Sequence, residues 1–239
     1  MRAVLASCLA IGAIAAPLLS ASPRKTHTVI LGAAKKVAYS KAGDPAGALP
    51  GEDSLKVRAL IVDGAVKEWT TGDAHDVTDR SFVVRRAIRL NDELPGEKIA
   101  AAQSHWVWQR GPWLLVDRTT GHISALKLPD YDPGVSRVSW FRDYGAYCGV
   151  TSSGKSLYAV VAQVAGRKPL LSKKLQPFEG AQDGQPGPLC PEPEWRRDPL
   201  RITFHPAGKD AVSYDLVPGS AVLVEDAADE PENPAAKSN

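Results

Sequence analysis

Residues 149–156 read Gly149-Val-Thr-Ser-Ser-Gly-Lys-Ser156, which fits the phosphate-binding pattern G-x-x-x-x-G-K-[ST] letter for letter. Such a loop needs a buried parallel strand before it and a helix after it. The preceding residues, 140–148, include two charged residues and a glycine, so they lack the continuous apolar run of a buried parallel strand. The following residues, 157–164, are rich in Val and Tyr and favour a strand over a helix. We therefore interpret the stretch as a β-hairpin turn that binds no nucleotide.

A second stretch, Phe204–Tyr214, repeats this arrangement: β-forming residues, then Gly-Lys, then an alternating strand. In both, a glycine stands where a short hairpin loop needs a positive φ. The two stretches resemble the S-P-D-G-K-x-L-x-[FY] hairpins of TolB-type β-propeller blades, over about a dozen residues each. Ser153 and Ala207 replace the aspartate that this family has before the glycine. The resemblance implies a fold of repeated small sheets.

Four turn glycines recur along the chain at Gly64, Gly111, Gly154 and Gly208, at spacings of 47, 43 and 54 residues. A period of ~40–50 residues is that of propeller blades. No sustained helical periodicity is present, so we expect little helix. The predicted fold class is therefore all-β and antiparallel, with propeller-like repeats of small sheets, four in a ring. A two-sheet β-sandwich is the alternative.

Residues 1–21 have the pattern of a signal peptide: Arg2, then an uncharged run of apolar and small residues. The run is short and is followed by charged residues, which argues against a membrane-spanning helix. We expect no membrane span once the signal peptide is cleaved. We therefore expect a secreted or periplasmic protein. Two cysteines then remain, Cys148 and Cys190, and in an oxidising compartment such a pair predicts one disulfide.

The mature chain divides into three parts. Residues 22–54 form an N-terminal strand, Thr26–Leu31, and a loop. Residues 55–224 form the β-rich repeat domain. Residues 225–239 hold five acids and one lysine with no large apolar side chain, which predicts a disordered acidic tail.

The charge and the aromatic residues exclude some classes of binding partner. The net charge is +2, with no Lys/Arg run of the kind that marks a nucleic-acid-binding patch. We expect the six tryptophans to pack between sheets, with a ligand groove as the alternative, and Trp108 to pair with Trp113 across a turn at Gly111. The expected partner is a protein, peptide or glycan, with no nucleic acid and no cofactor.

The densest polar cluster lies in residues 72–79, where Asp73, His75 and Asp76 could hold a divalent metal through oxygen and nitrogen donors. The favoured interpretation is an inter-strand loop whose aspartates form turns with nearby backbone N–H groups. The motifs G-x-S-x-G, H-E-x-x-H and C-x-x-C are absent from the sequence. The sequence thus predicts an exported, non-catalytic, β-rich binding module. The alternative is a metal-dependent hydrolase centred on Asp73, His75 and Asp76.

Overall fold

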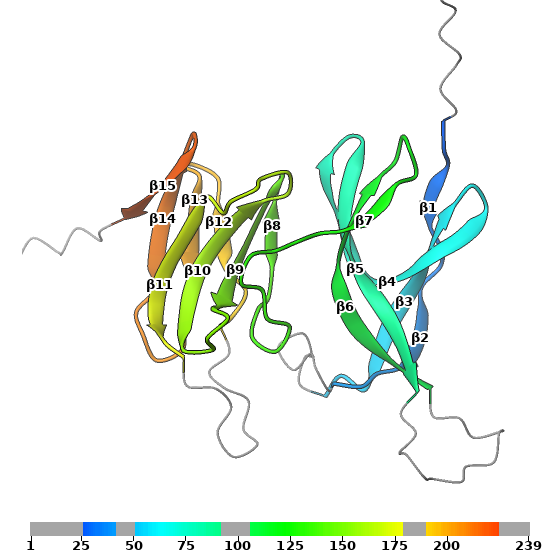
Figure 1. The fold of residues 1–239 in the computed structure, drawn as a ribbon, viewed down its shortest axis with the longest axis horizontal. Helices are drawn as coiled ribbons and strands as arrows, with labels where there is room; N and C mark the ends of the chain where they lie inside the picture. Colours follow the sequence, from blue (N-terminus) through cyan, green and yellow to red (C-terminus); the bar gives the residue numbers. More distant parts are fainter. Residues whose placement is uncertain (1–25, 42–50, 92–105, 179–189, 225–239) are drawn as a thin grey trace, which may run out of the picture.

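The computed structural model describes residues 26–41, 51–91, 106–178 and 190–224 (Figure 1). These residues form three antiparallel sheets of seven, four and four strands and no helix, which confirms the predicted all-β class. The predicted signal peptide and acidic tail lie outside the described residues.

Within the described ranges, no helix is long and apolar enough to cross a membrane.

The seven-stranded sheet is made by the first half of the chain. Its strands are β1 (Val29–Leu31), β2 (Lys35–Ala38), β3 (Ser54–Val62), β4 (Ala65–Thr78), β5 (Ser81–Asn91), β6 (Trp106–Asp117) and β7 (Ile123–Ala125). They run in the order β1-β3-β4-β5-β6-β7, and β2 pairs with β3 beside β1. The sheet curls back on itself, because Tyr39 forms a parallel bridge with Trp108 of β6 and the Ser40 N–H donates to the Trp108 carbonyl at 2.9 Å.

The expected hairpin turn at Gly111 is wrong, because β6 runs through Gly111 and Pro112 without a break. Strand β5 pairs with β6 on both sides of this point, and the register shifts there by one residue, which is a β-bulge. Proline has no N–H to donate, and a bulge is one of the few places where a strand accepts it. A side chain at Gly111 would come within 2.7 Å of Ile88, so this glycine allows β5 and β6 to pack closely.

The other two sheets follow in the second half of the chain. One contains β8 (Ser139–Phe141), β9 (Tyr144–Val150), β10 (Ser156–Gln163) and β11 (Leu171–Pro177). The other contains β12 (Glu194–Arg196), β13 (Arg201–Phe204), β14 (Val212–Val217) and β15 (Ser220–Val224). Buried residues of both sheets, among them Leu157, Val161, Ile202 and Phe204, belong to one core cluster, so the two sheets pack on each other.

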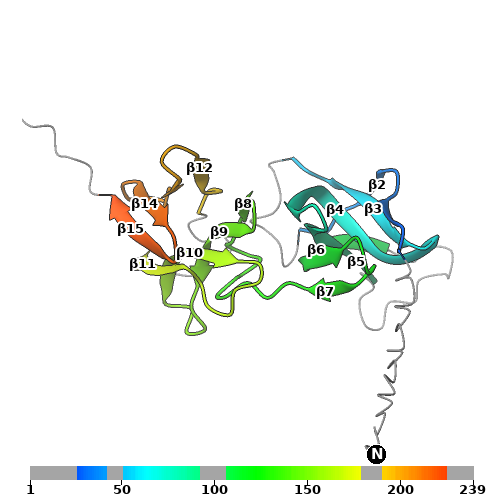
Figure 2. The ribbon, with the colours of Figure 1, turned by 90° about the horizontal axis from the view of Figure 1, so that it is seen from above.

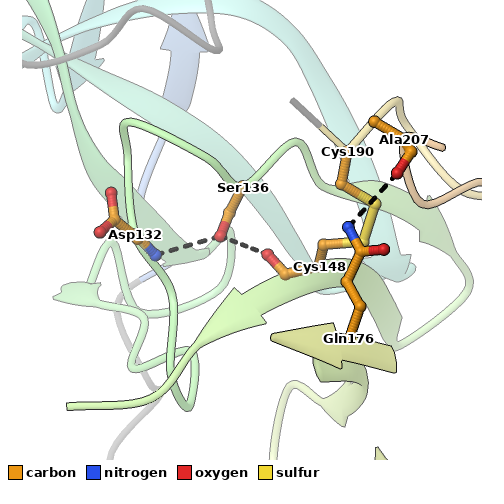
Figure 3. Close-up of a disulfide and its surroundings, with 6 residues drawn as sticks. All are labelled: Asp132, Ser136, Cys148, Gln176, Cys190 and Ala207. Carbon is orange, nitrogen blue, oxygen red and sulfur yellow. Dashed lines mark hydrogen bonds between the residues drawn. A yellow bond between two sulfur atoms is a disulfide. The ribbon is translucent and has the colours of Figure 1, made fainter. Parts of the chain in front are cut away.

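A disulfide joins Cys148 of β9 to Cys190, with 6.0 Å between the two Cα atoms, which confirms the predicted pairing (Figure 3). Both cysteines are buried in the shared core. Beside them the fully buried Ser136 hydroxyl donates to the Cys148 carbonyl at 2.6 Å and accepts from the Asp132 N–H at 3.1 Å. The Ser136 hydroxyl thus ties the segment before β8 to β9, and the disulfide ties the residues before β12 to the same strand.

Three of the four predicted turn glycines stand in hairpin turns with positive φ: Gly64 (79°), Gly154 (67°) and Gly208 (72°). The described residues nevertheless form no closed propeller. Strands β4, β5 and β6 are 14, 11 and 12 residues long, and they pair in sequence within one curled sheet instead of separating into equal blades. The packed β8–β11 and β12–β15 sheets are closer to the sandwich alternative.

Candidate binding site at the junction of the sheets

One face of the seven-stranded sheet packs against the β8–β9 hairpin, and aromatic rings make the contact. The His75 ring of β4 stacks on Trp140 of β8, with ring centroids 6.0 Å apart and planes 22° apart. Trp113 of β6 meets the same Trp140 ring edge to face, with centroids 5.1 Å apart. His75 Nε2 also lies 2.7 Å from the backbone carbonyl oxygen of Arg142. We call this contact between His75, Trp113, Trp140 and Arg142 the junction.

The predicted metal residues belong to β4, so the interpretation of 72–79 as an inter-strand loop is wrong up to Thr78. His75 pairs with Val83, and Asp76 with Phe82, at successive positions, so the two side chains point to opposite faces of the sheet. Asp76 accepts a hydrogen bond from Arg118 at 2.7 Å, and Asp73 is exposed. The structure therefore separates Asp76 from His75 instead of gathering the three around one point.

No group of three or more His, Cys, Asp or Glu side chains in the described part of the chain is arranged to hold a metal ion.

Beside the junction lies a pocket of about 430 Å³, which we call the junction pocket. One wall is the β6 bulge, and the other is the segment between β7 and β8, which Figure 2 shows running from the first sheet to the second. The lining residues are mainly apolar, with two cations and no carboxylate: Arg110, Gly111, Pro112, Trp113, Leu126, Lys127, Leu128, Tyr131 and Pro133.

Two arginines contact the residues that form the walls of the junction pocket. Arg110 makes two hydrogen bonds of 3.0 Å to the Glu52 carboxylate and one of 2.8 Å to the Tyr39 hydroxyl, so its charge is balanced within the protein. Arg85, only 8% exposed, donates to the Gly111 carbonyl at 3.0 Å. Its guanidinium lies 6.0 Å from the centre of the Trp113 ring and 5.8 Å from that of Tyr131, so Arg85 contacts both aromatic walls.

Two polar groups of the lining have no partner among the described residues. Lys127 is exposed and makes no ion pair within the described part of the chain. The Trp113 indole N–H is buried, and no acceptor for it lies in that part. A buried donor without an acceptor costs about 1–3 kcal/mol. Because this N–H is closed to solvent, Lys127 is the polar group of the two that a ligand in the pocket can contact.

Tyr131, which lines the junction pocket, is packed edge to face on Tyr147 of β9, with ring centroids 5.7 Å apart. The Tyr147 hydroxyl donates to the Pro129 carbonyl at 2.6 Å. Burial raises the pKa of Tyr147 well above its usual range, and the nearby charge of Asp130 adds to the shift, so the hydroxyl stays protonated as a donor. This contact ties the outer wall of the pocket to a fully buried tyrosine.

A second pocket of about 430 Å³ shares Leu128 and Tyr131 with the first but has the opposite charge. Asp130 and Asp132 line it, together with Thr151, Ser152 and Gly154 of the β9–β10 turn. The turn that matches the phosphate-binding pattern therefore faces two carboxylates, which would repel a phosphate group. No helix follows it either, since β10 begins at Ser156, and the hairpin interpretation is confirmed.

The sequence indicated Trp113 only as one of six tryptophans that could line a ligand groove, which was the alternative interpretation, and it did not indicate Lys127 and Tyr131 as site residues. Trp108 was expected to pair with Trp113, but it packs against Trp69 inside the curled sheet, with ring centroids 5.6 Å apart, while Trp113 packs on Trp140. The one local signal was Gly111-Pro112 directly before Trp113, since Gly and Pro within a strand often mark a bulge. Lys127 and Tyr131 carry no sequence signal of their own.

A comparison of the chain with protein-family models, curated proteins and solved structures found no match.

Proposed function

We propose that the protein is an exported, non-catalytic binding module whose ligand occupies the junction pocket. The observation that carries the proposal is the pocket itself: a preformed space of about 430 Å³ whose mainly apolar lining includes two aromatic side chains and one exposed lysine. This volume and this kind of lining are typical of ligand sites in proteins. The disulfide supports export, because such bonds persist in oxidising compartments.

The lining favours binding over catalysis. Hydrolytic and transfer reactions use a nucleophile next to a general base, commonly Ser or Cys with His, or a pair of carboxylates. The residues described as lining the junction pocket include no Ser, Cys, His, Asp or Glu. His75 is close by in the junction, but its Nε2 is already engaged by the Arg142 carbonyl. A site with aromatic walls and few polar groups suits recognition.

The proposal is tested by a ligand screen that measures the melting temperature of the disulfide-bonded protein. A ligand present at a hundred times its dissociation constant adds about 2.7 kcal/mol of stability. The shift should be reduced in the variant Trp113→Phe and kept in Trp195→Phe, which changes a tryptophan of β12 outside the pocket. A ligand shift that is unchanged in Trp113→Phe and in Lys127→Gln would place binding elsewhere and refute the proposed site.

Export is tested separately. N-terminal sequencing of protein recovered from outside the cytoplasm should find a chain that begins near Ser22. An intact Met1 in that fraction would contradict the predicted cleavage.

A further inference from the structure

We infer that the ligand of the junction pocket is a flat aromatic molecule that carries a single carboxylate. This inference rests on the proposed function and adds the chemical class of the ligand. Two features of the pocket carry it: its two aromatic walls, and Lys127, the one cation among its described lining residues that makes no ion pair in the described part of the chain.

The walls favour a flat apolar body. Trp113 comes from the seven-stranded sheet and Tyr131 from the segment before β8, so an aromatic ring in the pocket meets an aromatic side chain from each wall. Such ring pairs contribute about 0.5–1.5 kcal/mol beyond the area that they bury. A sugar or an extended peptide brings many hydroxyl or amide groups, and each costs free energy when buried without a partner. The lining offers too few polar groups to satisfy them.

The charges favour one carboxylate. Arg110 is neutralised by Glu52, which leaves Lys127 as the uncompensated cation among the lining residues. Among the described residues, no acidic side chain lines this pocket, whereas those that line the neighbouring pocket include Asp130 and Asp132 and no cation. The two pockets share Leu128 and Tyr131, so the sign of the charge changes across a single segment. An anion is therefore drawn to the junction pocket and repelled by its neighbour.

The Lys127 ammonium supplies the polar contact. It is exposed and makes no ion pair within the described part of the chain, and a carboxylate is a strong acceptor for an ammonium group. The Trp113 indole N–H is buried away from solvent, so a ligand in the pocket contacts other atoms of that ring and not its N–H. The class that combines these features is an aromatic monocarboxylic acid in its ionised form.

The test compares 2-naphthoate with 2-naphthamide, a neutral molecule of nearly the same shape, by titration calorimetry at neutral pH and low salt. We expect naphthoate to bind about tenfold more tightly, because a hydrogen bond to a charged group is stronger than one to a neutral group. Added salt should reduce the difference, because Lys127 is exposed and salt screens its charge.

Substitutions test which residues cause the preference for naphthoate. Lys127→Gln should remove the preference for naphthoate, while Lys173→Gln, at an exposed lysine of β11, should leave it unchanged. Trp113→Phe should weaken both compounds and retain the preference. Circular dichroism and melting temperature establish that each variant is folded.

The outcomes separate this inference from the proposed function. Equal binding of the two compounds, both weakened in Trp113→Phe, would refute the carboxylate class and leave the binding site standing. A naphthoate preference that survives Lys127→Gln would also refute it. Binding of neither compound at millimolar concentration would overturn the aromatic class, while a different ligand found in the screen would still support the site.

Discussion

His75 donates a hydrogen bond from Nε2 to the backbone carbonyl oxygen of Arg142, over 2.7 Å and across 67 residues of sequence. A carbonyl oxygen can only accept, so Nε2 must carry a proton. Arg142 has φ of 51°, in the left-handed region, and lies between β8 and β9. One side chain of β4 therefore fixes a turn of the second half of the chain.

The first prediction concerns this bond. His75→Ala removes both the hydrogen bond and the stacking on Trp140, and we expect a loss of about 1–2 kcal/mol. In a chain of this size that loss lowers the melting temperature by roughly 2–8 °C. His122→Ala is the matched control, since His122 is exposed in the turn before β7. Metal analysis on the same samples is informative, because stoichiometric metal that disappears in His75→Ala would restore the metal interpretation.

The second prediction concerns the bulge in β6. Gly111→Ala places a methyl group 2.7 Å from the Ile88 side chain, and relief requires a change of the Ile88 rotamer or a shift of β5 or β6. Overpacking of this kind costs about 1–3 kcal/mol. Gly32→Ala is the control, because its methyl group would meet Ala59 at an ordinary 3.5 Å. Urea unfolding measures both.

The double variant Gly111→Ala/Ile88→Ala tests the mechanism behind this prediction. Removing most of the Ile88 side chain makes room for the new methyl group, so the cost of Gly111→Ala should be smaller in the Ile88→Ala background. Costs that simply add in the double variant would show that the close approach to Ile88 is not the cause.

Local turn chemistry made part of the fold predictable. Gly64, Gly154 and Gly208 stand at positive φ in hairpin turns, and the residue pattern around each was sufficient to place the turn. Gly111 carries a similar pattern but has no positive φ, because β5 supplies pairing partners along the whole of β6. Pairing with a distant strand is a tertiary property, and the sequence near Gly111 does not encode it.

The candidate site was harder to predict for the same reason. Asp73, His75 and Asp76 are close in sequence, but an extended strand sends neighbouring side chains to opposite faces. Trp113 and Trp140 are far apart in sequence and meet at the junction. The local sequence therefore indicated a cluster of Asp73, His75 and Asp76, two of which the strand sends to opposite faces. It did not indicate the contact between Trp113 and Trp140, because only the packing of the sheets creates it.

The third prediction concerns the disulfide. Cys148 and Cys190 are 42 residues apart, and closing a loop of this length stabilises by about 4 kcal/mol in the chain-entropy model. Cys148→Ala/Cys190→Ala should therefore melt at a much lower temperature than the oxidised protein. Mass spectrometry of non-reduced peptides should show the two cysteines linked, and free thiols in protein recovered from outside the cytoplasm would contradict this.

The fourth prediction separates a hairpin turn from a phosphate loop. Lys155→Ala should leave the melting temperature unchanged, because Lys155 is exposed and its side chain is in no ion pair within the described residues. Gly154→Val should cost about 1–3 kcal/mol, because a β-branched residue is strained at its φ of 67°. Micromolar ATP binding by the wild type, abolished in Lys155→Ala, would refute the turn interpretation.

The last prediction concerns pH and the cross-strand pair Arg201–Asp215 on β13 and β14. The guanidinium donates to the carboxylate at 2.7 and 3.1 Å, and this hydrogen bonding lowers the pKa of Asp215 below its ordinary value. A carboxyl group with a lowered pKa in the folded state stabilises the fold above the unfolded-state pKa. That stability is lost as pH falls through the folded-state pKa, so the loss begins below about pH 5.

Asp215→Asn should therefore lose stability at pH 7 but little at pH 3, so its free energy of unfolding should vary less between these two values than that of the wild type. Some dependence should remain, because hydrogen bonds from the backbone N–H groups of Thr120 and Thr119 lower the pKa of Asp117 in the same direction. Asp210→Asn, at an exposed aspartate between β13 and β14, is the control. Urea unfolding at pH 7 and pH 3 measures the difference. If the free energy of unfolding of Asp215→Asn depends on pH as strongly as that of the wild type, the Arg201–Asp215 pair contributes nothing to the pH dependence.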